Sequence, residues 1–493
     1  MKKMYIAQVV SMMGMAFVAV HASAQTNVVE PVAAEASPAV VNADALTLPQ
    51  VVEKAVLTHP EVRARFNDFM SSLEGQNIAK AGWRPQITAQ GWVGHEWRSN
   101  IPNSPSYDWG RHGWNLELRQ LIFDGFGTSN SIRQYGFEKL SRYYDLRATT
   151  EILANEAVAA YLDVQRYREM ERMAHENFTM HQTTLNQLRE RQQSGVGRGV
   201  DMEQANGRLS LAQTNLMTES NNLNDVSQRY RRIVGEYPAQ TLDPVPEVDG
   251  KLPVVGTVEN FNDALRVHPS ILSKQALVQA AEAGQKVAKA AHSPTLDLRA
   301  SIGRDREQPS DAYRDVQSSR VQLMLTYPLY RGGADEARIR QTVAQTYAAQ
   351  DVRDYTCRNV QQELSVTWNN IIRLRQQLPF LREHELSTSK VRVAYQQQFH
   401  IGQRSLLDLL DTENELFDAR RALINAQYDL KKAEYQWLMQ SSQVLSALNL
   451  QTPHQDSQPD ENNDLVLPDD IIAACQTPVP DTSNLNPLVA TGG

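Results

Sequence analysis

The segment Leu296-Asp297-Leu298-Arg299-Ala300-Ser301-Ile302 alternates apolar and polar side chains. A period of two predicts a β-strand with one apolar and one polar face. The stretch from Val321 to Tyr327 alternates in the same way, and a polar loop lies between the two. We expect strands at about 294–304 and 318–329, of the length and pattern that membrane-spanning barrels use.

The first half of the chain carries a similar pair, with strands expected at about 85–98 and 113–123. Four strands cannot close a barrel by themselves, because the smallest single-chain barrels have about eight. Lipid does not tolerate an open sheet edge, so strands that enter a membrane require several chains. Two amphipathic hairpins in a soluble sheet remain the alternative.

The two halves are copies of each other. His59-Pro60 recurs as His268-Pro269 and Ala79-Lys80-Ala81 as Ala288-Lys289-Ala290, each 209 positions later, while Ile132-Arg133-Gln134 recurs after 207 positions. This spacing is too long for a solenoid repeat. We therefore expect a first repeat over 46–240, a linker over 241–257 and a second repeat over 258–450.

Long helices are expected between the strands. Helical periodicity covers about 48–83, 128–193, 200–234, 258–291, 334–399 and 405–448. The longest of these would extend on the order of 100 Å at a rise of 1.5 Å per residue. Leu209, Leu216 and Leu223 recur every seven residues, which predicts coiled-coil packing. A coiled coil without a pore would explain this pattern equally well.

The first residues are typical of an export signal. Lys2 and Lys3 precede an apolar stretch that ends near Val20, and Ala22-Ser23-Ala24 fits a cleavage site. We expect a signal peptide over 1–24, a flexible leader over 25–45 and a C-terminal tail over 451–493, both outside the core. After the signal, no apolar run is long enough for a transmembrane helix.

Composition excludes several functions. The formal net charge is -8 without a basic cluster, which argues against a nucleic-acid partner. Phosphate-binding loops and zinc motifs are absent, and the 11 histidines are scattered, so we expect no enzyme activity, no cofactor and no metal. The two cysteines, Cys357 and Cys475, would meet an oxidising compartment and either pair or remain free thiols.

Several segments carry a resemblance to a known family. They are the duplicated helix starts His59-Pro60 and His268-Pro269, the turn Leu121-Ile122-Phe123-Asp124-Gly125, its partner Pro328-Leu329-Tyr330-Arg331-Gly332-Gly333, and above all the run Ile401-Gly402-Gln403-Arg404-Ser405-Leu406-Leu407-Asp408-Leu409-Leu410-Asp411. In these segments the chain, from about Leu46 to Leu448, resembles the TolC family of outer-membrane export channels. The resemblance implies a mainly α protein with a transmembrane β part. It also implies a homotrimer in which four strands per chain form a 12-stranded barrel in the outer membrane, continued by an α-helical tunnel in the periplasm.

The resemblance implies two tip turns that meet a periplasmic adaptor, at about 194–200 and 400–405. Their residues would be Val196, Gly197 and Arg198 in the first turn, and Ile401, Gly402 and Gln403 in the second. The first turn is shorter than in familiar relatives and has Arg198 where an apolar residue is common.

The resemblance also implies a gate. Asp408 and Asp411 would ring the entrance, and Arg404 would link to Asp201 to hold it shut. Phe399 replaces a tyrosine of the closing network and cannot donate a hydrogen bond, a role that the neighbouring His400 would have to take. A capping role fits Asp408 equally well, because Ser405 and Asp408 match the pattern Ser-x-x-acid, and the same alternative covers Asp201 with Gln204.

The stretch Tyr355-Thr356-Cys357-Arg358-Asn359-Val360-Gln361-Gln362 and the acidic tail are similar to the LapE- and AggA-like branch, which serves type I secretion of large adhesins. The sequence thus predicts an exit duct that works with an adaptor and an inner-membrane ABC transporter. A multidrug efflux channel is the alternative, and a periplasmic coiled-coil adaptor is the alternative of another class.

Overall fold

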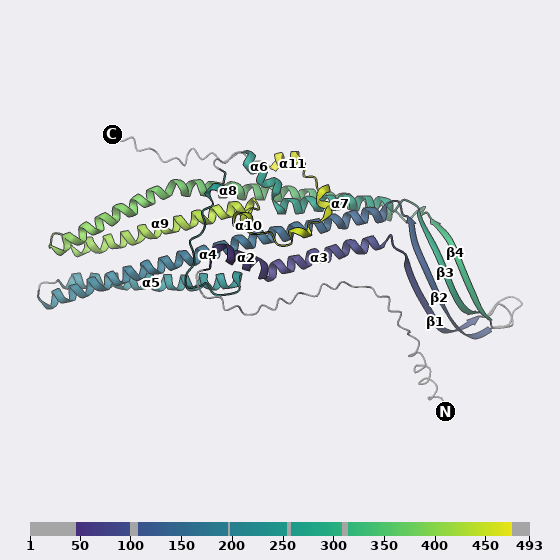
Figure 1. Cartoon of the computed structure of the whole chain (residues 1–493), viewed down its shortest axis with the longest axis horizontal. Coiled ribbons are helices and arrows are strands. Elements are labelled where there is room, and N and C mark those ends of the chain that lie inside the picture. The colour runs from purple at the N-terminus through teal and green to yellow at the C-terminus, as the bar shows by residue number, and fades with distance from the viewer. Residues whose placement is uncertain (1–45, 99–106, 196–197, 254–257, 308–313, 476–493) are drawn as a thin grey trace, which may run out of the picture. The chain divides into compact units, whose positions relative to one another are not determined.

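The computed structural model describes residues 46–98, 107–195, 198–253, 258–307 and 314–475 (Figure 1). The expected signal peptide, the flexible leader and the end of the tail lie outside these residues. The described residues form one compact unit.

Four antiparallel strands form one sheet in the order β1-β2-β3-β4. They are β1 (Gln86–Arg98), β2 (Tyr107–Phe123), β3 (Thr295–Glu307) and β4 (Arg314–Thr326). β2 and β4 begin earlier than expected, so less of each intervening polar segment is loop. β4 ends before the expected residue 329 because Pro328 has no N–H to donate to a neighbouring strand.

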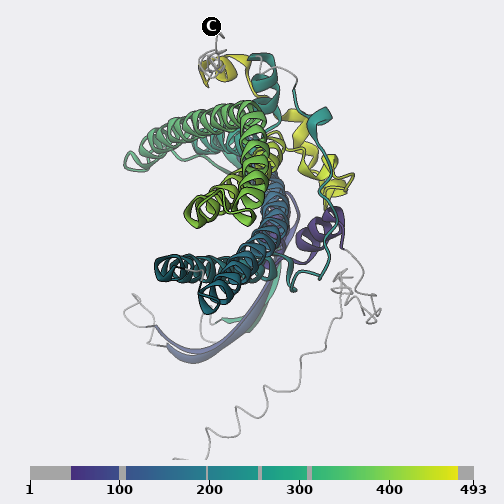
Figure 2. The same ribbon diagram turned by 90° about the vertical axis from the view of Figure 1, so that its left-hand side faces the viewer.

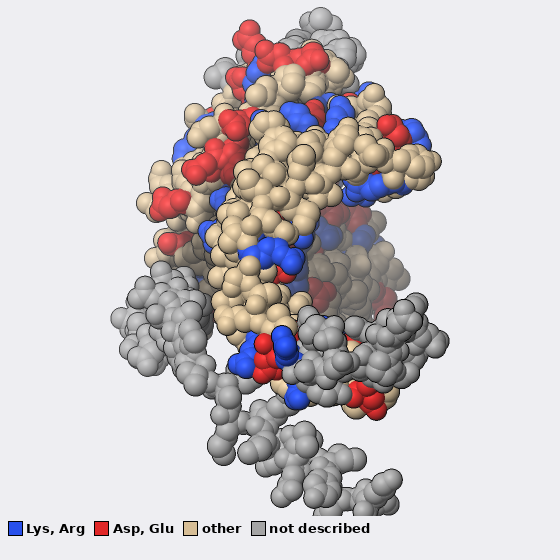
Figure 3. All heavy atoms as spheres, turned by 90° about the vertical axis from the view of Figure 1, so that its right-hand side faces the viewer, with Lys and Arg blue, Asp and Glu red and all other residues tan. Residues whose placement is uncertain are grey.

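The sheet is continuous across the duplication, because β2 of the first repeat pairs with β3 of the second. One of its faces is apolar and open, with Val93, Val321 and Leu323 among its exposed side chains. Seen from the end that carries the strands, charged groups are scattered over a largely uncharged surface (Figure 3).

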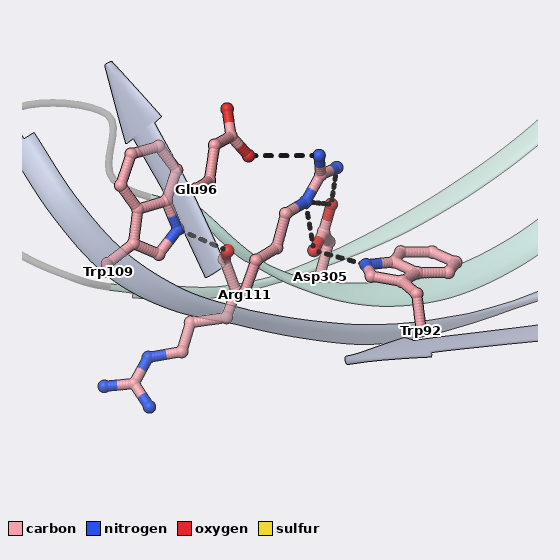
Figure 4. Close-up of polar contacts among 6 residues, drawn as sticks. Trp92, Glu96, Trp109, Arg111 and Asp305 are labelled. Carbon is pink, nitrogen blue, oxygen red and sulfur yellow. Dashed lines mark hydrogen bonds and ion pairs between the residues drawn. The ribbon is translucent and has the colours of Figure 1, made fainter. Parts of the chain in front are cut away.

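The opposite face of the sheet is polar. At the far end of the strands Arg111 of β2 bonds Asp305 of β3 (Nη2 to Oδ2, 2.5 Å) and Glu96 of β1 (Nη1 to Oε2, 3.2 Å) (Figure 4). The Trp92 indole donates to Asp305 at 3.2 Å. A single arginine therefore connects three strands and both repeats.

Two of the expected helices, at about 48–83 and 258–291, are each divided into two shorter helices. These and the other helices are α2 (Leu48–Thr58), α3 (Pro60–Ala81), α4 (Gly127–Gln193), α5 (Gly199–Val234), α6 (Val258–Val267), α7 (Pro269–Ala290), α8 (Ala334–His400) and α9 (Leu406–Gln440). The chain turns extended at His59 and His268, each before a proline that disfavours helix in the preceding residue. Each histidine then caps the new helix, with its Nδ1 accepting an N–H two residues on.

α4 and α8 contain 67 residues each and lead into two antiparallel hairpins, α4/α5 and α8/α9. The hairpins lie next to each other, and their turns are at the end of the unit opposite the sheet (Figures 1 and 2). α9 packs on α4 and so joins them. Among the described residues, no helix combines the length and the apolar character needed to cross a bilayer.

The expectation that the tail lies outside the core is wrong for its described part. Ile472 is 1% exposed and belongs to the main core cluster. Glu461 forms an ion pair with Lys139 of α4 at 2.9 Å, and the His454 ring stacks on Phe66 of α3. We call residues 441–475, which include α10 (Val444–Ala447) and α11 (Asp469–Cys475), the C-terminal strap. Its apolar residues are spaced irregularly, so periodicity did not reveal them.

The strap ends at a disulfide. Cys475 of α11 bonds Cys357 of α8, with their Cα atoms 5.8 Å apart. Both side chains are buried. The strap is thereby fixed covalently to the helix it crosses.

We expect Cys475→Ser to lower the free energy of unfolding by about 2–4 kcal/mol, because the cross-link restricts the unfolded chain. Thermal denaturation of detergent-purified protein would measure this, and the double variant C357S/C475S should lose no more than the single one. Alkylation of both cysteines in the native protein without reductant would contradict the pairing.

A buried carboxylate holds the start of the strap. Glu151 of α4 is 5% exposed, and its Oε2 accepts the N–H of Val444, the first residue of α10, at 3.1 Å. Burial raises the pKa of Glu151 to about 7, although this hydrogen bond and Arg147 oppose the shift. The folded protein therefore keeps the Glu151 carboxyl protonated over a pH range in which the unfolded chain releases that proton.

Protonation of Glu151 therefore adds to the free energy of unfolding. This contribution is largest below about pH 4.5, decreases between about pH 4.5 and 7, and is lost above about pH 7. We expect Glu151→Gln, which keeps an acceptor for Val444, to stabilise the protein at about pH 8 by up to about 3 kcal/mol and to have little effect near pH 5. Thermal denaturation at both pH values checks this, with the exposed Glu176→Gln on the same helix as the control. An equal effect at both values would contradict the raised pKa.

Candidate gate at the helix tips

The α8–α9 turn lies where the sequence predicts it. Gly402 has φ +76°, a conformation that glycine adopts without strain. Its N–H donates to the Phe399 carbonyl at 3.1 Å, and the N–H of Gln403 donates to the Gln398 carbonyl at 2.8 Å. These bonds close the end of α8 in the manner of a glycine C-cap.

The α4–α5 turn contains Gly195 with φ +77°. Val196 and Gly197 lie outside the described residues. Arg198 is extended and exposed directly before α5. The glycine with positive φ in the described part of this turn is thus Gly195, which the sequence analysis did not single out.

Phe399 joins the two hairpins near their turns. It is 8% exposed and packs in a cluster with residues of α4, α5 and α9: Leu185, Leu188, Ala205, Leu406, Leu409 and Leu410. The Arg191 guanidinium lies 4.9 Å from its ring centroid. The neighbouring His400 is exposed, and its imidazole forms no hydrogen bond with any residue in the described part of the chain. Apolar packing and the Arg191 guanidinium therefore hold Phe399 in place.

Arg404 is held by its own hairpin. Its guanidinium lies 4.2 Å from the Tyr395 ring centroid and its Nε donates to Gln398 at 3.0 Å. Its Nη1 lies 3.6 Å from Asp408. Between the described residues of a single chain, Arg404 makes no ion pair with Asp201, so that link stays a prediction.

Asp408 has the capping role that its spacing allows. Its N–H donates to Ser405 Oγ at 3.2 Å, and Ser405 Oγ in turn donates to its carboxylate at 2.9 Å. Asp201 instead lies in the first turn of α5, whose N-cap is Arg198, so Asp201 is not itself the cap. A carboxylate there is favoured by the helix dipole.

Asp411 pairs across the hairpins. Its Oδ1 lies 2.5 Å from Nη2 of Arg208 in α5, and both side chains are partly exposed. No local pattern in the sequence indicates this contact, because the two residues lie 203 positions apart on different helices. Arg191 and Tyr395 were missed for a similar reason, since their partners depend on helix packing.

Together, the duplicated amphipathic sheet and the paired helical hairpins have the architecture expected of an outer-membrane channel. The model of the family described as "Outer membrane efflux protein" matches residues 51–236 and 260–438. The chain belongs to this family, and its place is the outer membrane.

Three relatives bear on function. The chain is 27% identical over 363 residues to the outer membrane efflux protein BepC of Brucella suis, covering 73% of this chain and 78% of that protein. It is 24% identical to the outer membrane protein TolC of Escherichia coli, covering 78% and 79%. It is 22% identical to the alkaline protease secretion protein AprF of Pseudomonas aeruginosa, covering 76% and 80%. The resemblance to the TolC family is confirmed.

A solved structure shows the same fold. The outer membrane channel CmeC of Campylobacter jejuni matches with a TM-score of 0.74 at 15% identity, covering 84% of this chain and 88% of that one. The predicted fold class, mainly α with four strands per chain, is confirmed.

We expect Arg404→Ala to raise the single-channel conductance in planar bilayers, because it removes the cation that Tyr395, Gln398 and Asp408 hold at the tip. Arg172→Ala is the matched control, since Arg172 is exposed on α4 and pairs only within its helix, with Glu176. Equal closed-state conductance of Arg404→Ala and the wild type would exclude Arg404 as a latch.

Proposed function

We propose that three copies of this chain close one channel, the exit duct of a tripartite export system. The observation that carries the proposal is the sheet with two open edges. Within the described strands, β1 and β4 each pair on one side only, and the sheet exposes an apolar face. Backbone groups at such edges need partners in lipid, which the neighbouring copies would supply.

We further propose that the hairpin turns are the periplasmic entrance. The exposed residues Arg198, Ile401 and Gln403 would contact an adaptor, together with Val196 and Gly197. Asp408 and Asp411 would ring the entrance in three copies. Since Arg208 already pairs with Asp411, that ring would carry less net negative charge than six free carboxylates.

We propose that the cargo is a protein, exported by an inner-membrane ABC transporter through an adaptor. The segment 355–362 and the acidic tail resemble the branch of the family that secretes adhesins. This resemblance supports a large adhesin as the cargo. AprF, whose name states protease secretion, supports protein export in general. Small-molecule efflux is the second candidate, because the name of the relative BepC states efflux.

Deletion of the gene should leave a large surface protein inside the cell and weaken biofilm formation, because the exit duct is missing. Immunoblotting of surface and cell fractions measures this, and a plasmid copy of the wild-type chain should restore display. Unchanged surface display together with new drug sensitivity would favour efflux.

A further inference from the structure

The duplication is preserved in the strand register. β1 and β3 begin 209 positions apart, at Gln86 and Thr295, and they also end 209 positions apart. β2 and β4 begin 207 positions apart. Gln86 pairs with Arg119 in the first hairpin, and the same shifts lead to the observed pair of Thr295 with Thr326 in the second. The two hairpins thus pair their strands in equivalent registers.

The contact between the hairpins occurs once within the chain, where β2 meets β3. We call this contact the inner seam. Gly113 lies opposite Asp305, Asn115 opposite Gly303, and Leu116 opposite Ile302. A Cβ on Gly303 would lie 2.7 Å from the Trp114 carbonyl and 3.1 Å from the Asn115 side chain, so this position requires glycine.

In a closed ring of copies, β4 of one chain meets β1 of the next, and β4 and β1 are the counterparts of β2 and β3. We propose that this outer seam repeats the register of the inner seam, which places Arg320 of one copy directly opposite Glu96 of the next. The inference rests on the proposed trimer. Side chains directly opposite each other have Cβ atoms about 4.5–5.5 Å apart, close enough for an ion pair.

The residues that this register brings together match the chemistry of the inner seam. Gln322 falls opposite Gly94, which repeats the pair of an amide and a glycine. A Cβ on Gly94 would meet nothing within 4 Å in the single chain, so the space is open to a neighbouring strand.

On the apolar face, Leu323 falls opposite Val93, as Leu116 lies opposite Ile302. Leu323 and Val93 are 65% and 72% exposed, whereas their inner-seam counterparts are 41% and 38% exposed. Leu323 and Val93 are more exposed because each lies on an edge strand, which has no neighbouring strand on one side within the chain.

The charged residues of the polar face are also compatible with this register. Arg320 lies on the polar face, opposite Ser301, and forms no ion pair with a residue that the structure describes. Glu96 lies on the same face, where it bonds Arg111 at 3.2 Å. A carboxylate has about four lone-pair sites and can accept from several donors at once.

Other registers are less favourable. A slip by one residue would turn the apolar side chains to the polar face. A slip by two residues in one direction would place Leu323 opposite the polar ring of His95, and in the other direction it would place Leu323 opposite Gly91, which offers no side chain to pack against.

Paired cysteines test the register. In E96C/R320C, oxidation should join neighbouring chains into covalent dimers and trimers on a non-reducing gel. β1 and β4 are the two edges of the sheet, so the link cannot form within one chain. The second predicted pair, V93C/L323C, should cross-link as well.

The matched control is G94C/R320C, which shifts one cysteine by two residues on the same face. It should cross-link several-fold less, because diagonal positions are about 7–8 Å apart. Each single-cysteine variant controls for exchange with Cys357 and Cys475. The native mass of each variant in detergent reports the oligomeric state independently of cross-linking.

A trimer that cross-links better through G94C/R320C than through E96C/R320C would overturn the register and leave the proposed function standing. A monomer by native mass would overturn both. As a further check, Glu96→Arg should lower the temperature at which the trimer dissociates, and E96R/R320E should recover part of that loss.

Discussion

A β-strand at a sheet edge has backbone N–H and C=O groups without partners, and a membrane offers no water to satisfy them. This constraint accounts for the design of the whole chain. Four strands are too few to close a cylinder, yet the chain carries them in two matched hairpins joined at β2 and β3. The duplication gives each hairpin the same two edges. An edge that accepts the other hairpin within the chain is therefore already suited to accept a hairpin of another copy.

In the helical part, side-chain contacts hold the two hairpins together, while residues at their turns are exposed. Packing between them is apolar where they cross, with Phe399 inside the cluster and Arg191 over its ring. Around this cluster lie ion pairs of partly exposed groups, including the pair of Arg208 and Asp411. Exposed pairs of this kind contribute little to stability, about 1 kcal/mol at most, and can be exchanged at small cost. The tips thus combine a fixed contact with exchangeable ones.

Much of the fold could be predicted from the sequence, because periodicity is local. Alternation located all four strands, and helical patterning located α4, α5 and α8 closely. Periodicity did not locate the helix starts at Pro60 and Pro269, since the apolar pattern continues through them while the backbone does not. Only the family resemblance indicated them. The strap was missed because its few buried residues, such as Ile472, follow no period. At the helix tips, the resemblance predicted the turn at Gly402, and the local pattern at Ser405 allowed the cap as one of two readings. The partners of Asp411 and Phe399 depend on how separate hairpins pack, which no local pattern encodes.

The disulfide between Cys357 and Cys475 has a topological effect. The covalent loop that it closes contains α8 from Cys357 to its end, all of α9 and the turn between them, whereas the α4/α5 hairpin lies outside it. Both legs of the α8/α9 hairpin are thereby linked covalently at their base, through the strap that follows α9. The described part of the chain has no such link between the legs of the α4/α5 hairpin. Oxidation therefore makes two hairpins that are equal by descent unequal in their covalent constraint.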